Sequence, residues 1–192
     1  MFILYPGVAI CSYDSTGGTR GPSVIQNWPG SKRTESKVPT KITYEAGKAR
    51  IHSWGFQCPP LEEISPGMAV KDMFKFYLDK TFLRDKFEGN FEAAPGNLDD
   101  VVLWFGDFLR ELYAHIKKYL QDIWKVDFNL TKVEYIFGLP TSWKDNYKLV
   151  QLFRSTAVEA GFRTDNIILD LTEAEASAIF TAKHTDEEFK VS

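Results

Sequence analysis

The chain has 192 residues, of which 44% are hydrophobic and 26% are charged, as is typical of a globular protein that forms one domain or part of a larger one. Its 23 basic and 26 acidic residues give a net charge of −3, which argues against a general attraction to nucleic acid or to an anionic membrane. No apolar run approaches the roughly 18 residues of a membrane span. We therefore expect neither nucleic-acid nor membrane partners.

Cysteine usage indicates a reducing environment. Cys11 and Cys58 are the two cysteines, too few for a disulfide framework, so the sequence predicts a cytoplasmic location. They form no Cys-x-x-Cys pair, and the three histidines lie far apart, so no metal site is expected. The apolar start lacks a basic leader and is interrupted at Pro6-Gly7, which argues against a signal peptide.

Residues 1–57 are predicted to form a β-rich start. The stretch "GVAICSY" alternates in polarity and predicts a strand, whereas the following segment 14–23 is rich in turn residues. Residues 38–56 contain two strand-like runs separated by Glu45-Ala46-Gly47-Lys48, which predicts a hairpin with a longer loop.

Residues 58–130 are predicted to form a helical insertion subdomain. Apolar residues recur at helical spacing over 68–83, which predicts a first helix. Asn97 is the expected N-cap of a second, long helix. Its apolar stripe is more typical of a core-facing helix than of a partner-binding one. The stripe consists of Leu98, Val102, Phe105, Leu109, Leu112, Ile116, Leu120 and Ile123.

Residues 131–184 are predicted to form a βαβα unit. The expected elements are a strand over 132–139, a helix over 141–161, a strand over 166–171 and a helix from 173 onward. Thr141 or Ser142 is the expected N-cap of the first helix, and Gly161 its C-terminal stop. Strands that alternate with helices in this way favour parallel pairing through a right-handed crossover.

Two carboxylates follow the last predicted strand. Glu173 and Glu175 lie in the stretch "LTEAEASAIF", directly after the apolar run "NIILDL". One interpretation is an acidic helix start, which the helix dipole favours. The other is one wall of a site whose remaining walls lie elsewhere.

Three segments in order resemble a known family: "VEYIFGLPTSW", "VQLFRSTAVEAGF" and "IILDLTEAEASAIF". They resemble the first lobe of the nucleotide-binding domain of the seventy-kilodalton heat-shock chaperones (heat shock protein 70). The short stretches "GVA", "WPG", "KVPT" and "WGF", with Phe74-Lys75, resemble the divergent fungal branch of these actin-like ATPases. The resemblance covers nearly all of residues 1–192. It implies an α/β, ribonuclease H-like fold, lobe I only, in which a mixed sheet is flanked by helices.

The same resemblance implies a site for ATP or ADP with Mg²⁺ in a cleft between two lobes. Glu173 matches a glutamate that orients the water shell of the metal. Lys75, in "MFKFYLD", matches a lysine directed at the γ-phosphate. Gly7 belongs to the segment that follows the first phosphate loop and is the implied cofactor-binding residue. Glu175 takes the place of a threonine and is expected to be a surface residue.

One part of the family pattern does not match. Counting back from Gly7, the hydroxyls of the first phosphate loop fall on Ile3 and Leu4, and its glycine falls on Phe2. The second lobe would follow Phe180. We therefore expect a truncated nucleotide-binding lobe without ATPase activity by itself, with unfolded protein clients or co-chaperones as the partners that the resemblance implies. The alternatives are a non-catalytic protein-interaction module and a gene-model fragment.

Overall fold

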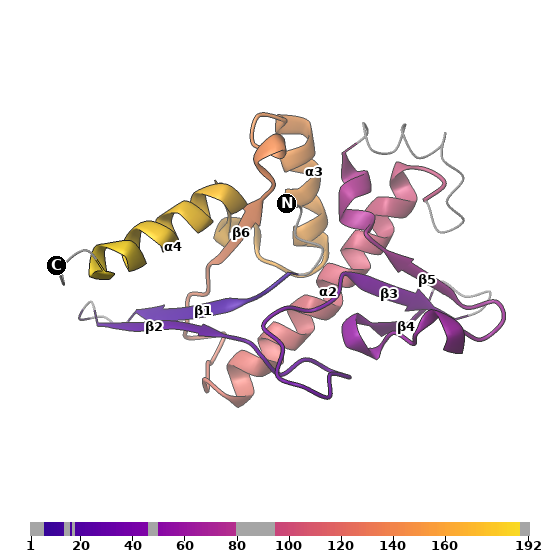
Figure 1. The fold of residues 1–192 in the computed structure, drawn as a ribbon, viewed down its shortest axis with the longest axis horizontal. Coiled ribbons are helices and arrows are strands. Elements are labelled where there is room, and N and C mark those ends of the chain that lie inside the picture. Colours follow the sequence, from indigo (N-terminus) through magenta and orange to yellow (C-terminus); the bar gives the residue numbers. More distant parts are fainter. Residues whose placement is uncertain (1–5, 14–15, 17, 46–49, 80–94, 189–192) are drawn as a thin grey trace. The chain divides into compact units, whose positions relative to one another are not determined.

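The computed structural model describes residues 6–13, 16, 18–45, 50–79 and 95–188. The chain divides into two compact units, Met1–Phe108 (unit 1) and Leu109–Ser192 (unit 2), each of which is described by itself. Helices and strands are both well represented (Figure 1), so the expected α/β class is confirmed. The expected boundaries after residues 57 and 130 stay a prediction.

Unit 1 contains two antiparallel sheets. Strand β1 (Ala9–Tyr13) pairs with β2 (Thr19–Val24), and β3 (Lys41–Tyr44) pairs with both β4 (Ile51–Trp54) and β5 (Ala69–Asp72) (Figure 1). The hairpin expected over 38–56 is therefore confirmed as β3–β4.

Strand β2 begins inside the segment that the sequence predicted as a turn. Its register with β1 skips between Ile10 and Ser12, where Gly21 and Pro22 lie opposite Cys11. A bulge on an edge strand accommodates a proline, which has no N–H to donate, and a glycine. The residues typical of turns therefore occur here in a strand.

The helix expected over 68–83 is wrong for its described part. Ala69–Asp72 is strand β5, held by backbone pairing with β3, and Phe74–Leu78 is the short 3-10 helix η3. Met73 separates them with a left-handed backbone conformation, φ +52°. Phe74, Tyr77 and Leu78 are buried, and their spacing of three and four suits a 3-10 turn as well as an α-helix. Residues 80–83 lie outside the described residues.

Two further 3-10 turns, η1 (Gly55–Gln57) and η2 (Leu61–Glu63), precede the long helix α2 (Leu98–Asp122). The expected cap is confirmed, since Asn97 Oδ1 accepts a hydrogen bond of 2.9 Å from the Asp100 N–H. The predicted stripe is core-facing along most of its length, and Ile123 at its end is exposed. Its buried members are Phe105, Leu109, Leu112, Ile116 and Leu120. None of the described helices is long and apolar enough to cross a membrane.

Unit 2 contains the predicted βαβα unit. Strand β6 (Tyr135–Leu139) pairs in parallel with β7 (Ile167–Thr172), helix α3 (Tyr147–Glu159) connects them, and α4 (Glu173–Glu188) follows. The expected parallel pairing is confirmed. The expectation of a single mixed sheet is wrong, because the antiparallel and parallel strand pairs of the described residues occur in separate sheets. Short connections favour antiparallel neighbours, whereas a crossover helix is what permits parallel ones.

The start of α3 differs from the expectation. Thr141 and Ser142 lie in the 3-10 turn η4 (Thr141–Trp143), and the N-cap is Asn146, whose Oδ1 accepts a 3.2 Å hydrogen bond from the Leu149 N–H. The predicted stop is confirmed. Gly161 has φ +114°, and a Cβ there would lie 2.9 Å from a ring carbon of Tyr113, so only glycine fits.

An aromatic cluster forms the core of unit 2. Phe162 is 2% exposed, and its ring centroid lies 4.8 Å from that of Tyr113, 4.9 Å from Tyr135 and 5.1 Å from Phe137. Phe137 also contacts Phe153 of α3 edge-on at 5.3 Å. Such edge-on pairs add to the gain from burial. The cluster therefore packs α3, and the segment that leads into the 3-10 turn η5 (Thr164–Asn166), against the parallel strands.

We predict that Phe162→Ala lowers the free energy of unfolding of unit 2 by about 3–5 kcal/mol, because it removes a ring from a closed core. Tyr147→Ala is the matched control, because Tyr147 is 74% exposed and its truncation should change stability by no more than about 0.5 kcal/mol. Urea unfolding followed through amide signals of unit 2 measures both. Equal midpoints for the two variants would contradict this account of the core.

Candidate functional site

Strands β6 and β7 end side by side in unit 2. Leu139 is in register with Thr172. Strand β6 is followed by Pro140 and η4, and strand β7 is followed directly by α4. Parallel strands bring their carboxyl ends to one edge, and ligand sites of open α/β sheets lie outside such edges. We call the residues there the carboxyl edge. It consists of Gly138, Lys144, Thr172, Glu173 and Glu175.

A reciprocal pair of hydrogen bonds defines the start of α4. The Glu175 N–H donates to Thr172 Oγ1 at 3.1 Å, and the Thr172 N–H donates to Glu175 Oε2 at 2.8 Å. This arrangement is a capping box, in which a threonine and a glutamate three residues later satisfy two backbone donors at a helix start. Thr172 is 2% exposed, so the box is anchored in the unit 2 core.

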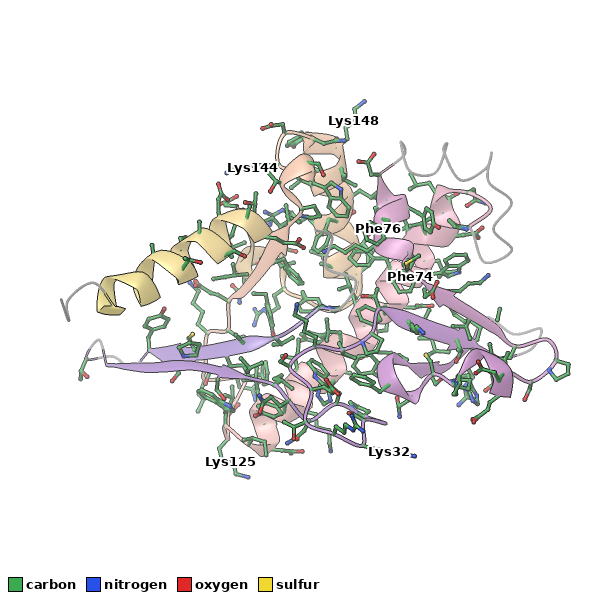
Figure 2. All side chains as sticks on the ribbon, in the orientation of Figure 1. Lys32, Phe74, Phe76, Lys125, Lys144 and Lys148 are labelled. Carbon is green, nitrogen blue, oxygen red and sulfur yellow. The ribbon has the colours of Figure 1, made fainter. Side chains whose placement is uncertain are left out.

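Lys144 joins the segment after β6 to the helix after β7. Its Nζ donates a hydrogen bond to Glu175 Oε1, and about half of each side chain is exposed (Figure 2). The hydrogen bond from Lys144 and those from Thr172 lower the pKa of Glu175 from 4.5 to about 2. In return, Glu175 raises the pKa of Lys144. The pair is therefore charged on both sides at neutral pH and contributes no net charge to the edge.

Glu173 is the first residue of α4 and lies outside the capping box. It is half-buried and adjoins Gly138 at the end of β6. If a Cβ is placed on Gly138, Glu173 Cγ at 3.7 Å is the only described atom within 4 Å, chain neighbours aside. Gly138 is exposed, so space open to solvent lies beside the stem of the Glu173 side chain.

Gly7 lies in unit 1, where the structure gives it a packing role. A Cβ on Gly7 would lie 2.9 Å from the backbone oxygen of Ser36. A hydrogen bond of 2.9 Å from the Val38 N–H to the Pro6 oxygen holds the two segments together. The close approach of two backbones explains a glycine here. Its cofactor-binding role stays a prediction.

Lys75 also lies in unit 1, in η3 rather than in the expected α-helix. It is half-buried, and its sequence neighbours Phe74 and Phe76 are labelled in Figure 2. The left-handed conformation of Met73 two residues earlier costs a non-glycine residue roughly 1–2 kcal/mol. Such strain persists only where the surrounding structure enforces it. The backbone at the start of η3 is therefore held in this conformation by its surroundings.

The sequence-predicted residues therefore fall into two groups. Glu173 and Glu175 come together in unit 2, whereas Gly7 and Lys75 belong to unit 1, and each unit is described by itself. Phe2, Ile3 and Leu4, on which the first phosphate loop was placed, lie outside the described residues. No group of three or more His, Cys, Asp and Glu side chains that could hold a metal occurs in the described part of the chain.

Sequence reasoning missed the roles of Lys144 and Thr172. Glu175 is at the surface as expected, with its side chain about half exposed, but its capping contacts were not foreseen. The capping box was detectable in principle, because Thr172 and Glu175 have its spacing and follow an apolar strand. Lys144 gave no signal, since 31 positions separate it from Glu175 and only the parallel pairing of β6 with β7 brings the two together.

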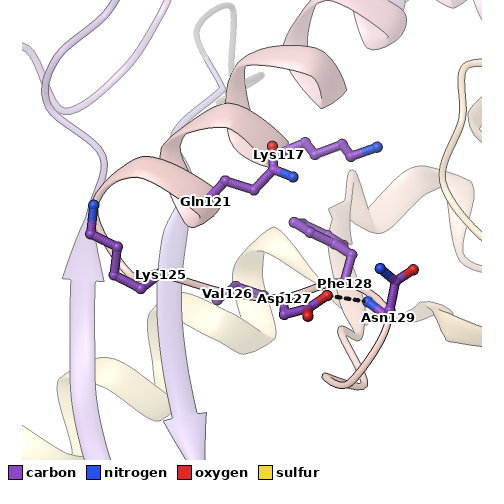
Figure 3. A pocket seen from close by; sticks show the side chains of 7 residues that line it. All are labelled: Lys117, Gln121, Lys125, Val126, Asp127, Phe128 and Asn129. Carbon is purple, nitrogen blue, oxygen red and sulfur yellow. Dashed lines mark hydrogen bonds between the residues drawn. The ribbon is translucent and has the colours of Figure 1, made fainter.

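A pocket of about 480 Å³ lies at the end of α2 in unit 2 and is lined by none of the carboxyl-edge residues (Figure 3). The ammonium of Lys117 lies 5.6 Å from the centre of the Phe128 ring, and Asp127 Oδ1 accepts a 2.8 Å hydrogen bond from the Asn129 N–H. None of the sequence-predicted site residues lines this pocket.

Comparisons of the chain with protein-family models, with curated proteins and with solved structures found no match. The resemblance to heat-shock ATPases therefore stays a prediction, and the geometry of the carboxyl edge is the ground for a functional proposal.

We predict that the Glu175 carboxyl titrates with a midpoint near pH 2. Because this pKa is lowered on folding, ionised Glu175 stabilises the fold above about pH 4.5, and the contribution is lost as pH falls toward 2. Carboxyl ¹³C NMR across this range measures the midpoint. Lys144→Ala should raise it toward 4.5, because Lys144 is the largest cause of the shift. A midpoint near 4.5 in the unchanged chain would contradict the clamped geometry.

Proposed function

We propose that this chain is a nucleotide-binding lobe of the heat-shock, actin-like ATPase type, and that its carboxyl edge faces Mg²⁺-bound ADP or ATP. The observation that carries the proposal is the position of Glu173 at the end of a parallel strand pair, beside the open space at Gly138. The order of segments that resembles lobe I supports it. A ribonuclease H-like arrangement of the units is part of the same proposal.

The residues at the edge suit a hydrated magnesium ion. Mg²⁺ keeps several waters and is usually held through one or two carboxylates plus the phosphates of its nucleotide. Glu173 is a single carboxylate of this kind, and it would accept a hydrogen bond from a metal-bound water. Glu175 binds Lys144 and caps the Thr172 N–H, so its role is to fix the first turn of α4.

Phosphoryl transfer depends on positioning and on neutralising the charge of the phosphates. Ile3 and Leu4 offer no hydroxyls for that task. We therefore propose weak binding, with a Kd of about 0.1–1 mM, or roughly −5.5 to −4 kcal/mol, and no ATP hydrolysis by this chain alone. Lys75 as a γ-phosphate contact, Gly7 as a cofactor contact, and unfolded clients or co-chaperones as partners are further parts of the proposal.

The direct test is an NMR titration of the chain with Mg-ADP. Glu173→Gln should weaken binding by about tenfold, because residues that hold metal-bound water typically contribute that much to metal affinity. Glu159→Gln is the matched control, since it makes the same change at an exposed position of α3 and should leave the Kd unchanged. With EDTA in place of Mg²⁺, the two variants should bind ADP equally.

Three results would contradict the proposal. The first is no binding at up to about 10 mM Mg-ADP, which is ten times weaker than the proposed range. The second is an equal effect of Glu173→Gln and Glu159→Gln on the Kd. The third is that the NMR signal changes are confined to residues far from the carboxyl edge.

A second candidate function is a non-catalytic protein-interaction module. Ile136 is 62% exposed and lies in register with the half-buried Ile168, so an apolar pair lies on an open part of the parallel strands. Parallel sheets are normally covered on both faces, and exposed apolar patches mark interaction sites. Sedimentation of the unchanged chain and of Ile136→Ser tests this candidate. Concentration-dependent association that Ile136→Ser abolishes would favour it, and a monomer in both cases would count against self-association.

A further inference from the structure

We propose that Gly138 is a specificity-determining residue of the carboxyl edge: its missing side chain keeps open the space beside Glu173 that the metal-bound phosphates enter. This inference rests on the proposed function and deepens it. We expect the ligand to be a hydrated divalent cation that carries a di- or triphosphate. The neighbouring side chain is the carboxylate of Glu173, and such cations retain water between metal and protein.

The fold itself does not require a glycine at this position. Gly30 has φ +81° and Gly161 has φ +114°, and a Cβ on either would lie within 3 Å of a neighbouring atom. Gly138 has no such positive φ, and its Cβ would meet only Glu173 Cγ, at an ordinary contact distance of 3.7 Å. The pairing of β6 with β7 shifts register between Ile136 and Gly138, but without a positive φ this irregularity accepts other residues.

Glycine at this position reduces stability. It lies within β6, where it opposes Leu171 across the parallel pair and is exposed. Glycine in a strand is less favourable than alanine, because a glycine loses more conformational freedom when the chain folds. A glycine inside a strand often marks either a bulge or a position that a ligand or another backbone approaches closely. A register shift lies next to Gly138, but its φ is not positive, so the shift by itself does not demand a glycine.

Gly21 is a useful comparison, because it has the same local freedom without a carboxylate beside it. No described atom lies within 4 Å of a Cβ placed on Gly21, and it belongs to the bulged edge strand β2 of unit 1. Gly138 differs in adjoining Glu173 at the end of a parallel strand. Of these two glycines, Gly138 is the one that adjoins an acidic side chain.

A side chain at Gly138 would occupy this space. A methyl group would stand in van der Waals contact with the stem of Glu173, where a water of the metal shell or a phosphate oxygen would otherwise lie. Valine would extend further in the same direction. Binding of a metal-bound nucleotide should therefore weaken in the order glycine, alanine, valine, while the strand itself becomes more favourable.

The experiment compares the unchanged chain with Gly138→Ala, Gly138→Val and the control Gly21→Ala. Each is titrated with Mg-ADP by NMR, and its thermal unfolding is followed. We expect Gly138→Ala to weaken Mg-ADP binding by about tenfold, which corresponds to 1.4 kcal/mol, and Gly138→Val to weaken it further. Gly21→Ala should leave the Kd unchanged. All three variants should unfold at temperatures equal to or above that of the unchanged chain.

The possible failures are distinguishable. If the unchanged chain binds Mg-ADP and both Gly138 variants bind it equally well, the inference about Gly138 is overturned while the proposed function survives. If Gly138→Ala lowers the unfolding temperature, the glycine serves the fold and the inference is again overturned, whatever binds. If the unchanged chain binds no Mg-ADP, the proposed function and this inference are overturned together.

Discussion

The burial of Phe162 is the constraint on which unit 2 depends. This ring contacts Tyr135 and Phe137 on β6, and it follows directly after Gly161, whose positive φ turns the chain back from α3. A parallel strand pair has no hairpin to hold it and needs its crossover helix packed against one face. Phe162 supplies that packing at the point where the crossover returns, so the register of β7 beside β6, and everything at their carboxyl ends, depends on it.

The capping box connects this packed core to the carboxyl edge. Thr172 is the last residue of β7 and the cap of α4 at once, so strand and helix are joined without a loop. Glu175 satisfies the Thr172 N–H and also binds Lys144 from the other strand's connection. Glu173 lies between these two fixed residues, and its backbone position is therefore set by them. Of the two initial interpretations of the acidic stretch, the helix start is confirmed at Glu175, and the wall of a site at Glu173 stays a prediction.

The sequence predicted those elements whose signals are local. The Asn97 cap, the Gly161 stop, the β3–β4 hairpin and the strand–helix alternation of unit 2 follow from turn chemistry and periodicity. It failed at residues 68–79, because a short apolar run with spacing of three and four suits an α-helix, or a strand followed by a 3-10 turn, and pairing with β3 decided the outcome. Lys144 was also unpredictable, since its contact with Glu175 is a product of the fold. The proposed site rests on Glu173 by resemblance, and on Gly138 by geometry alone.

The most direct test of the central claim is paramagnetic broadening by Mn²⁺-ADP, with Mn²⁺ in place of Mg²⁺. Relaxation of amide protons near the metal reports its position independently of affinity. The account predicts selective broadening of Gly138, Leu139 and the first turn of α4, and its loss in Glu173→Gln. Broadening concentrated at the pocket around Lys117 and Phe128, or uniform weak broadening that Glu173→Gln does not change, would contradict a metal-nucleotide site at the carboxyl edge.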